Sequence, residues 1–282
     1  QASDIEHLYL NEAENRLVFV DGHYSPELSK IVDQAALVIG NLPEFLSTHS
    51  ATLECHLGQY ATFENNVFSA LNTAFLRDAA LILVPKNVSV TNPIHLLFIA
   101  TQQEVTSYPR CLLTGETGSN VTIIEDYVAL QDATYITNSV TEISLAANAH
   151  ARHIRVQREN THAFHFANCA VSLAHASHYQ SASISLGSHI SRYNLDVRLL
   201  DEAAECVIDG LTLISDRQLA DTHTCIDHVK PNGTSHQQHK CIVDDSAHAV
   251  FNGKIIVRPH AQRTNSSQSS RNLLLSSAAQ ID

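Results

Sequence analysis

Beyond Arg77 the chain consists mainly of short apolar runs and of segments in which apolar and polar residues alternate. The first two runs cover residues 80–84 and 94–99, and proline or asparagine bounds each of them. Continuous or alternating apolar runs of roughly four to eight residues are typical of β-strands. The pattern predicts strands at residues 80–84, 94–99, 121–124, 140–145, 153–156, 170–173, 181–186, 194–199, 206–208, 211–214, 241–243 and 254–257.

The first 76 residues follow a different pattern. Residues 16–20 form one strand-like run, and apolar side chains then recur at helical intervals from Leu42 to Leu57. Asn41 is a residue type that caps helices, and Gly58 is one that ends them. Residues 64–75 repeat the helical spacing. We therefore predict two short helices, at residues 41–58 and 64–75, in an N-terminal region that spans residues 1–76.

Small-residue corners recur through the strand-rich part. Triplets at residues 148–150, 175–177 and 202–204 are 27 residues apart, and similar ones follow at 246–248 and 277–279, after 44 and 31 residues. Such self-similarity is typical of solenoids, in which each coil packs only against its neighbours. A β-sandwich, the alternative, would need frequent hairpin turns. We predict an all-β-dominated fold with a right-handed parallel β-helix at residues 77–282, cut short before a C-terminal helical domain.

Charge and cysteine content narrow the partners and the compartment. The chain has 17 basic and 29 acidic residues and a formal net charge of −12, which disfavours binding to nucleic acid or to an anionic membrane. No apolar run reaches the roughly 18 residues that cross a bilayer. The six cysteines show no CxxC spacing. We expect free, mostly buried thiols in a reducing compartment, either the cytoplasm or an organelle stroma.

Eighteen histidines raise the question of a metal site. Four HxxH pairs occur, at His150/His153, His162/His165, His175/His178 and His236/His239. On a strand, residues three apart point to opposite faces, so these pairs do not predict shared ligation. The densest polar stretch, residues 221–240, offers His223, Cys225 and His228 as candidate ligands for a soft metal. A long hydrogen-bonded loop between coils is the commoner interpretation of such a stretch.

Acidic residues leave one enzymatic alternative open. Parallel β-helices include polysaccharide lyases and hydrolases that line a groove with carboxylates, and the candidate carboxylates here are Asp126, Asp132, Asp196, Asp201 and Asp209. Their scatter over different strands gives no pair at a fixed separation. The sequence also lacks a P-loop and a GxSxG nucleophile motif. We predict no catalytic residues, with Asp196 or Asp201 as the carboxylates to replace in a test of the lyase or hydrolase alternative.

Four segments together resemble the SufB/SufD family of iron–sulfur cluster assembly proteins. They are residues 17–29, 68–98, 223–240 and 251–276. The stretch VDGHYSPELS at residues 20–29 and the Phe-Asn-Gly-Lys at residues 251–254 are closer to SufD than to SufB members. The resemblance covers most of the chain.

This resemblance implies a non-enzymatic scaffold that partners SufB-like and SufC-like subunits, SufC being an ATPase, or forms a homodimer when SufB is absent. It implies a location in the cytoplasm or in the plastid stroma. It implies no resident cofactor in these residues; an iron–sulfur cluster would be present only transiently, at the SufB interface. The cysteine–histidine motif of the family's C-terminal part would follow Asp282.

The resemblance also suggests where partners bind. The family's S-x-Q-x-x-K pattern falls on Ser235, Gln237 and Lys240, and its last pattern falls on residues 271–274. Unpaired strand edges favour pairing with other chains. The expected partner interface comprises Asn252, Arg258, Gln268, Arg271 and Asn272. A purely structural, self-associating solenoid is the remaining alternative.

Overall fold

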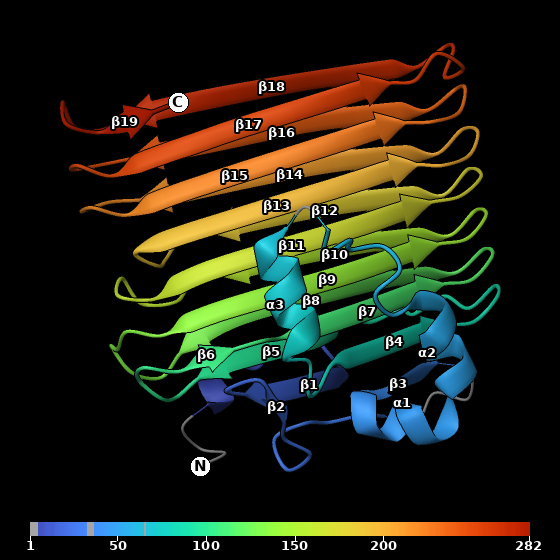
Figure 1. The fold of residues 1–282 in the computed structure, drawn as a ribbon, viewed down its shortest axis with the longest axis horizontal. Coiled ribbons are helices and arrows are strands. Elements are labelled where there is room, and N and C mark those ends of the chain that lie inside the picture. Colours follow the sequence, from blue (N-terminus) through green and yellow to red (C-terminus); the bar gives the residue numbers. More distant parts are fainter. Residues whose placement is uncertain (1–4, 33–36, 65) are drawn as a thin grey trace.

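The chain folds into a flattened stack of parallel β-strands arranged in two facing sheets (Figure 1). The computed structural model describes residues 5–32, 37–64 and 66–282. From β7 onward successive strands alternate between the sheets, so each coil contributes one strand to each sheet, and the coils form a β-solenoid of about seven turns. The predicted fold class, an all-β-dominated parallel solenoid with short helices in the N-terminal part, is confirmed.

The nine-stranded sheet has the order β18-β16-β14-β12-β10-β8-β5-β1-β2. Its strands are β1 (Asn15–Val20), β2 (His23–Tyr24), β5 (Ile94–Ala100), β8 (Asn120–Ala129), β10 (His150–Gln157), β12 (His178–Ser185), β14 (Glu205–Ile214), β16 (Thr234–Val243) and β18 (Asn265–Leu274). Strand β1 pairs in parallel with β5, so residues before position 77 continue this sheet. The domain division at residues 76 and 77 stays a prediction.

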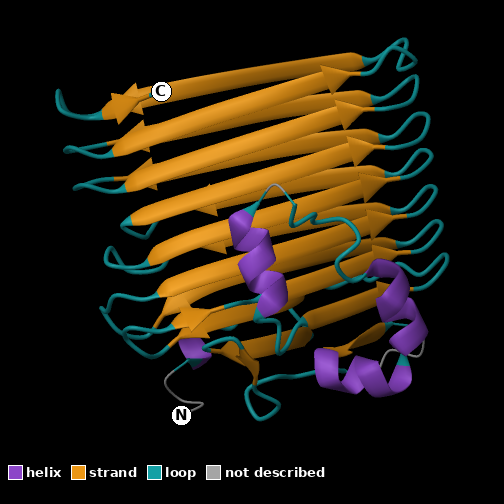
Figure 2. Ribbon diagram, viewed as in Figure 1, coloured by secondary structure: helices purple, strands orange, loops and turns teal. Residues whose placement is uncertain are grey.

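The ten-stranded sheet follows the path β19-β17-β15-β13-β11-β9-β7-β4-β3, with β6 paired to β9 beside it. Its strands are β3 (Val38–Asn41), β4 (Ala80–Val84), β6 (Thr106–Ser107), β7 (Arg110–Gly115), β9 (Ile136–Leu145), β11 (Phe164–Leu173), β13 (Ile190–Leu199), β15 (Leu219–His228), β17 (His248–Val257) and β19 (Gln280–Ile281). Helices lie against the outer face of this sheet (Figure 2).

Coil length explains the recurring corners. His150 pairs with His178, His178 with Glu205, and Glu205 with Thr234, at spacings of 28, 27 and 29 residues. The first three triplets lie at one edge of the solenoid, where the chain passes from the ten-stranded to the nine-stranded sheet. Residues 246–248 lie at the opposite edge, between β16 and β17. The 44-residue gap is therefore about one and a half coils, and the repeat is more regular than the triplets suggest.

The continuous apolar runs of β4 and β5 arise because both faces of each strand are covered. All seven residues of β5 are buried. Its outward side chains Leu97 and Ile99 pack with Ile5 and Leu8 of the first described segment. Outward Leu81 of β4 packs against the first helix. Strands β12 and β13 are covered on one face only, and they alternate as half-buried strands do.

The described residues form three α-helices before the main stack: α1 (Leu42–Thr48), α2 (Ser50–His56) and α3 (Val67–Ala74); a 3₁₀ turn, η2 (Glu6–Leu8), lies earlier. The single helix predicted at residues 41–58 is wrong in one respect. It breaks at His49, whose backbone angles (φ −136°, ψ 33°) are not helical. The second predicted helix begins later than expected, at Val67, because the Asn66 side chain caps it by accepting from the backbone N–H groups of Phe68 and Ser69.

The polar stretch at residues 221–240 is not a long loop. It forms most of strands β15 and β16, joined by a short corner. The pattern hid β15 because its inward positions include Thr222 and Thr224, which share a buried hydrogen-bonded interior with Gln237. None of the helices in the described part of the chain combines the length and apolar character that a membrane span needs.

Two predicted strands, 206–208 and 211–214, are one strand, β14, with Gly210 in its middle. Gly210 lies in register with His239 of β16 and faces the interior. A Cβ atom at Gly210 would lie 2.0 Å from Nδ1 of His239. Glycine is needed here because the imidazole occupies the space that any larger side chain would take.

Candidate functional site

A groove of about 540 Å³ lies on the outer face of the ten-stranded sheet. Its floor comes from β11, β13, β15 and β17, and one wall comes from the segment that leads into α3. Side chains of Asn, Arg, Asp, His, Cys and Lys line the floor, and Tyr60, Thr62, Asn66 and Ser69 line the wall. Concave sites of this size are the usual places for ligand binding.

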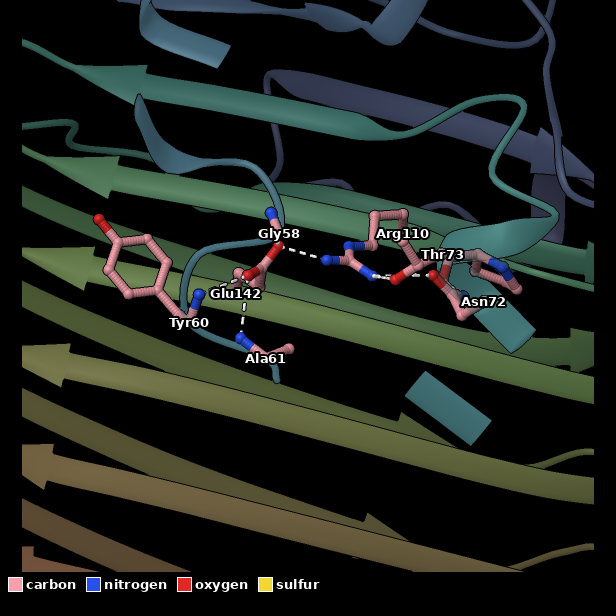
Figure 3. A network of polar contacts seen from close by, with 8 residues as sticks. Gly58, Tyr60, Ala61, Asn72, Thr73, Arg110 and Glu142 are labelled. Carbon is pink, nitrogen blue, oxygen red and sulfur yellow. Dashed lines mark hydrogen bonds and ion pairs between the residues drawn. The ribbon is translucent and has the colours of Figure 1, made fainter. Parts of the chain in front are cut away.

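A buried ion pair fixes the wall to the sheet (Figure 3). Glu142 of β9 lies 2.5 Å from NH2 of Arg110 on β7, and both side chains are almost fully buried. The Glu142 carboxylate also accepts hydrogen bonds from the backbone N–H groups of Gly58, Tyr60 and Ala61, at 2.8 to 2.9 Å. A buried carboxylate needs this full set of donors to offset its loss of water.

Helix α3 binds the sheet through its polar side. The Asn72 side chain donates to the backbone oxygens of Pro109 and Asn138, at 2.9 and 2.8 Å, and accepts from NH1 of Arg110 at 3.1 Å. Apolar Val67 and Leu71 on the other side of the helix are exposed. The helix position is therefore set by directional hydrogen bonds together with the stacking of Phe68 on Phe166 of β11, whose ring centroids lie 4.0 Å apart.

Parallel register arranges the groove floor in rows. Because neighbouring strands pair without offset, outward side chains at equivalent positions form rows that run across β11, β13, β15 and β17. One row is Asn168, Asn194, His223 and Asn252; the next is Ala170, Asp196, Cys225 and Lys254. Within the first row, Asn194 Nδ2 donates a hydrogen bond to Asn168 Oδ1 at 2.8 Å.

Some charges of the floor neutralise each other. Asp221 accepts from NH1 of Arg192 at 2.7 Å and lies 2.8 Å from Nε2 of His223. Asp227 pairs with Arg258, whose Nε and NH2 both donate at 2.9 Å. These pairs are partly exposed, so they contribute little net free energy and mainly orient the side chains.

The three candidate metal ligands do not come together. His223 and Cys225 point outward into the groove, but His228 points into the solenoid, where its Nε2 lies 2.9 Å from the Ser235 hydroxyl. Burial and the neighbouring Asp196 carboxylate raise the pKa of the Cys225 thiol, which disfavours the thiolate that a soft metal binds. No group of three or more His, Cys, Asp or Glu residues suited to a metal occurs within residues 5–32, 37–64 and 66–282.

The other cysteines fit the expectation of buried free thiols in four cases. Cys111, Cys169, Cys206 and Cys241 are buried, whereas Cys55 is exposed. No cysteine in the described ranges forms a disulfide.

The candidate carboxylates stay scattered. Asp126 binds Arg158 through two hydrogen bonds of 2.9 and 2.6 Å, and Asp132 lies at an exposed corner. Asp201 lies in a corner of the chain and Asp209 lies on β14 of the opposite sheet. Of these five carboxylates, only Asp196 lines the groove. The candidate carboxylates therefore do not form a facing pair for glycosidic chemistry.

Sequence reasoning missed a polar cluster inside the solenoid. Glu125 accepts from the Thr141 hydroxyl at 2.6 Å and from the Tyr127 hydroxyl at 3.1 Å, and it lies 3.5 Å from Nε2 of His153. Burial favours the neutral acid, but the interactions with His153, the Thr141 hydroxyl and the Arg155 guanidinium together outweigh burial, so the pKa of Glu125 lies below its usual value. The alternation of β8 gave a partial signal, since Glu125 occupies an inward position.

A second buried group adjoins it. Nδ1 of His165 lies 2.6 Å from Glu159, and its Nε2 lies 2.5 Å from NH2 of Arg155. Burial lowers the pKa of His165 despite the opposing charge of Glu159. The ring is thus neutral, with Nδ1–H donating to Glu159 and Nε2 accepting from Arg155, whose guanidinium lies 4.6 Å from the Tyr193 ring centroid.

The expected interface residues lie in two places. Asn252 and Arg258 belong to the outer face of the ten-stranded sheet, beside the groove. Gln268, Arg271 and Asn272 lie on β18, all of whose residues are exposed. Register shows that Gln268 and Asn272 continue inward-facing rows of β16, whereas Arg271 continues the outward row of Lys240.

The matched family patterns divide in the same way. Ser235 and Gln237 are buried inside the solenoid and bond to His228 and Thr224, so they serve the fold. Lys240 is exposed on the outer face of the nine-stranded sheet.

Comparison with known proteins finds two matching family regions. Residues 98–282 match the family described as SUF system FeS cluster assembly, SufBD core domain. Residues 9–96 match the SufBD protein N-terminal region.

Individual relatives agree. An iron–sulfur cluster assembly SufBD family protein of Synechocystis is 40% identical over 289 residues, which cover 98% of this chain and 64% of the relative. The iron–sulfur cluster assembly protein SufD of Escherichia coli is 31% identical over 271 residues, covering 95% and 62%. The chloroplastic protein ABCI7 of Arabidopsis thaliana is 30% identical over 226 residues, covering 77% and 48%.

The chain spans less than two thirds of the length of these relatives. The two family regions nevertheless cover nearly all of its residues and coincide with the solenoid and its helical wall. The chain therefore belongs to the SufBD family of the SUF iron–sulfur cluster assembly system.

Proposed function

We propose that the chain is a non-catalytic scaffold subunit of the SUF assembly complex, partnering SufB-like and SufC-like subunits. The observation that carries this proposal is the match of residues 98–282 to the SUF-system SufBD core domain. Strand β18 is the last long strand of the nine-stranded sheet in this chain, and the proposal places the contact with the SufB-like subunit along it. An open, flat strand edge presents backbone donors and acceptors that a strand of another chain can satisfy.

The sequence of β18 suits a specific contact. Solvent-facing strand edges are commonly protected by charges or proline, but β18 carries Ser, Asn and Gln with a single Arg271, followed by exposed Leu273 and Leu274. Polar side chains of this kind can hydrogen-bond across an interface, and the two leucines can be buried in it. A homodimer through the same edge is the competing assembly when a SufB-like subunit is absent.

An iron–sulfur cluster, in this proposal, is cargo and not a resident group. It would be present transiently at the contact with the SufB-like subunit. The chain would work in the cytoplasm or, in a plant relative, in the plastid stroma.

Co-expression tests the proposal. The full-length protein that contains this chain is produced with the SufB-like and SufC-like proteins of its own organism, and the complex is isolated by a tag and weighed by native mass spectrometry. We expect recovery of both partners. Arg271→Glu places an opposite charge at the centre of the edge and should lower recovery of the SufB-like partner by roughly tenfold.

Arg152→Glu is the matched control, because Arg152 is exposed on β10 in the middle of the same sheet. Recovery of neither partner, or an equal loss in both variants, would rule out an assembly through β18.

A further inference from the structure

Three charged side chains of the groove have no ion-pair partner among the residues that the structure describes. Five charged residues line it: Arg192, Asp196, Arg198, Asp227 and Lys254. Arg192 pairs with Asp221 and Asp227 pairs with Arg258. Asp196, Arg198 and Lys254 take part in no ion pair within 4.0 Å in the described part of the chain. Two cations and one anion are therefore available to a ligand.

Their positions follow from the register. Asp196 and Lys254 lie in the same row, separated by Cys225 on the intervening strand. Neighbouring strands are about 4.8 Å apart, so the two Cα atoms are about 10 Å apart. Arg198 lies two residues beyond Asp196 on the same face of β13, about 7 Å along the strand. The three side chains surround one area of the groove floor.

The environment strengthens their interactions. Asp196 lies in the concavity, where partial loss of water raises the pKa of its carboxyl. Charge-assisted hydrogen bonds are stronger where water is partly excluded. Arg198 and Lys254 have long, exposed side chains, so they can turn toward a ligand.

We propose that the groove binds a small dicarboxylate that carries an ammonium group, the chemistry of an acidic amino acid. Arg198 and Lys254 bind the two carboxylates, and Asp196 binds the ammonium. The same chemistry occurs at the free amino terminus of an acidic peptide. The net charge of −12 repels anions in general, so binding of a ligand with net charge −1 would reflect the local arrangement and not long-range attraction.

Three probes separate the contacts: glutamate has both carboxylates and the ammonium, glutarate lacks the ammonium, and glutamine lacks one carboxylate. Titration calorimetry on the full-length protein should show the tightest binding for glutamate. Glutarate and glutamine should each bind roughly tenfold more weakly, as expected for the loss of one charged hydrogen bond.

Variants assign each contact to a residue. Asp196→Asn should weaken glutamate binding about tenfold and leave glutarate binding unchanged or stronger. Lys254→Gln should weaken both. Lys240→Gln is the matched control, because Lys240 is exposed on the opposite sheet. Thermal unfolding of each variant checks that the fold is retained.

Peptides distinguish the two sources of the ligand. If an acidic peptide with a free amino terminus binds more tightly than glutamate, a peptide end is the ligand; if glutamate binds more tightly, the ligand is a free amino acid. Acetylation of the peptide should abolish its advantage. The proposal is overturned if glutamate at millimolar concentration does not bind, if Asp196→Asn weakens glutarate as much as glutamate, or if Lys254→Gln behaves like Lys240→Gln.

Discussion

The outer face of the ten-stranded sheet has a covered part and an open part, and the same row of positions crosses both. Glu142 occupies this row on β9, beneath the helical wall, and Asp196 and Lys254 occupy it on β13 and β17. Glu142 has Arg110 and three backbone donors, whereas Asp196 and Lys254 have no ion-pair partner in the described ranges. Charged side chains at equivalent positions of the repeat thus anchor the helical wall in one coil and have no ion-pair partner in another.

The difference shows what covering a charge requires. A buried carboxylate persists only where nearly every oxygen lone pair has a donor, so Glu142 constrains the wall that surrounds it. An exposed one imposes no such constraint and leaves the residue free for a ligand. The two parts should therefore respond to mutation in different ways.

The largest difference should come from removing the two carboxylates. Glu142→Ala leaves Arg110 buried without its partner and three N–H groups without an acceptor, so we expect a loss of about 3–5 kcal/mol in the free energy of unfolding. Asp196→Ala should change it by less than about 0.5 kcal/mol. Urea unfolding followed by circular dichroism measures both. Equal losses would show that the two positions are equivalent.

The buried imidazole of His239, in the solenoid interior behind the open part of the face, should make the free energy of unfolding depend on pH. Burial lowers the pKa of His239 from 6.5 to about 4. Between these values the unfolded chain binds a proton that the folded chain does not, so stability should fall as the pH drops from about 6.5 toward 4, by up to about 3 kcal/mol. Other buried groups titrate too, so the measurement is the difference between wild type and His239→Gln across this range. A difference independent of pH would contradict the expectation.

A substitution at Gly210 tests how much the packing around His239, inside the solenoid, contributes to stability. Gly210→Ala forces a methyl group against the His239 ring, which stacks on Phe251 with ring centroids 4.5 Å apart. We expect a loss of about 1–3 kcal/mol. Adding His239→Ala removes the clash, so the double variant should lose less free energy of unfolding than the two single variants lose in sum. Simple additivity would mean that the two residues do not contact.

The smallest effect should come from the paired charges of the groove. Arg192→Gln removes an ion pair whose arginine is 39% exposed, so the expected loss is below about 1 kcal/mol and should shrink further in high salt. Thermal unfolding at low and high salt measures it, with Lys240→Gln as the control. A loss as large as that of Glu142→Ala would contradict the distinction between covered and open charges.

Periodicity sufficed to predict the strands whose inward residues are apolar, such as 140–145 and 194–199. It failed for β15, because threonines and His228 occupy inward positions, where Thr224 and His228 hydrogen-bond to Gln237 and Ser235 of β16. The argument about HxxH pairs is confirmed where both members lie on one strand: His150 is exposed and His153 buried, and His236 is exposed and His239 buried.

The site depended on contacts that spacing does not reveal. Arg110 and Glu142 are 32 residues apart, and Glu142 binds N–H groups more than 80 residues away. Nothing in the sequence near Arg110 or Glu142 indicates these contacts, because three of the donors are backbone N–H groups of an irregular segment. The row of Asp196, Cys225 and Lys254 becomes visible only once the coil length is known, since it sets which residues become neighbours.

Helix α3 turns its amides toward the sheet and its aliphatic side chains toward solvent. Surface redesign guided by hydropathy would therefore choose the wrong face of this helix: Asn72→Leu would remove two hydrogen bonds to the sheet, whereas Leu71→Lys would leave them in place. Hydrogen bonds to fixed carbonyls also prevent the helix from sliding or rotating as an apolar contact would allow. The width of the groove beside it is thus a fixed dimension of the molecule.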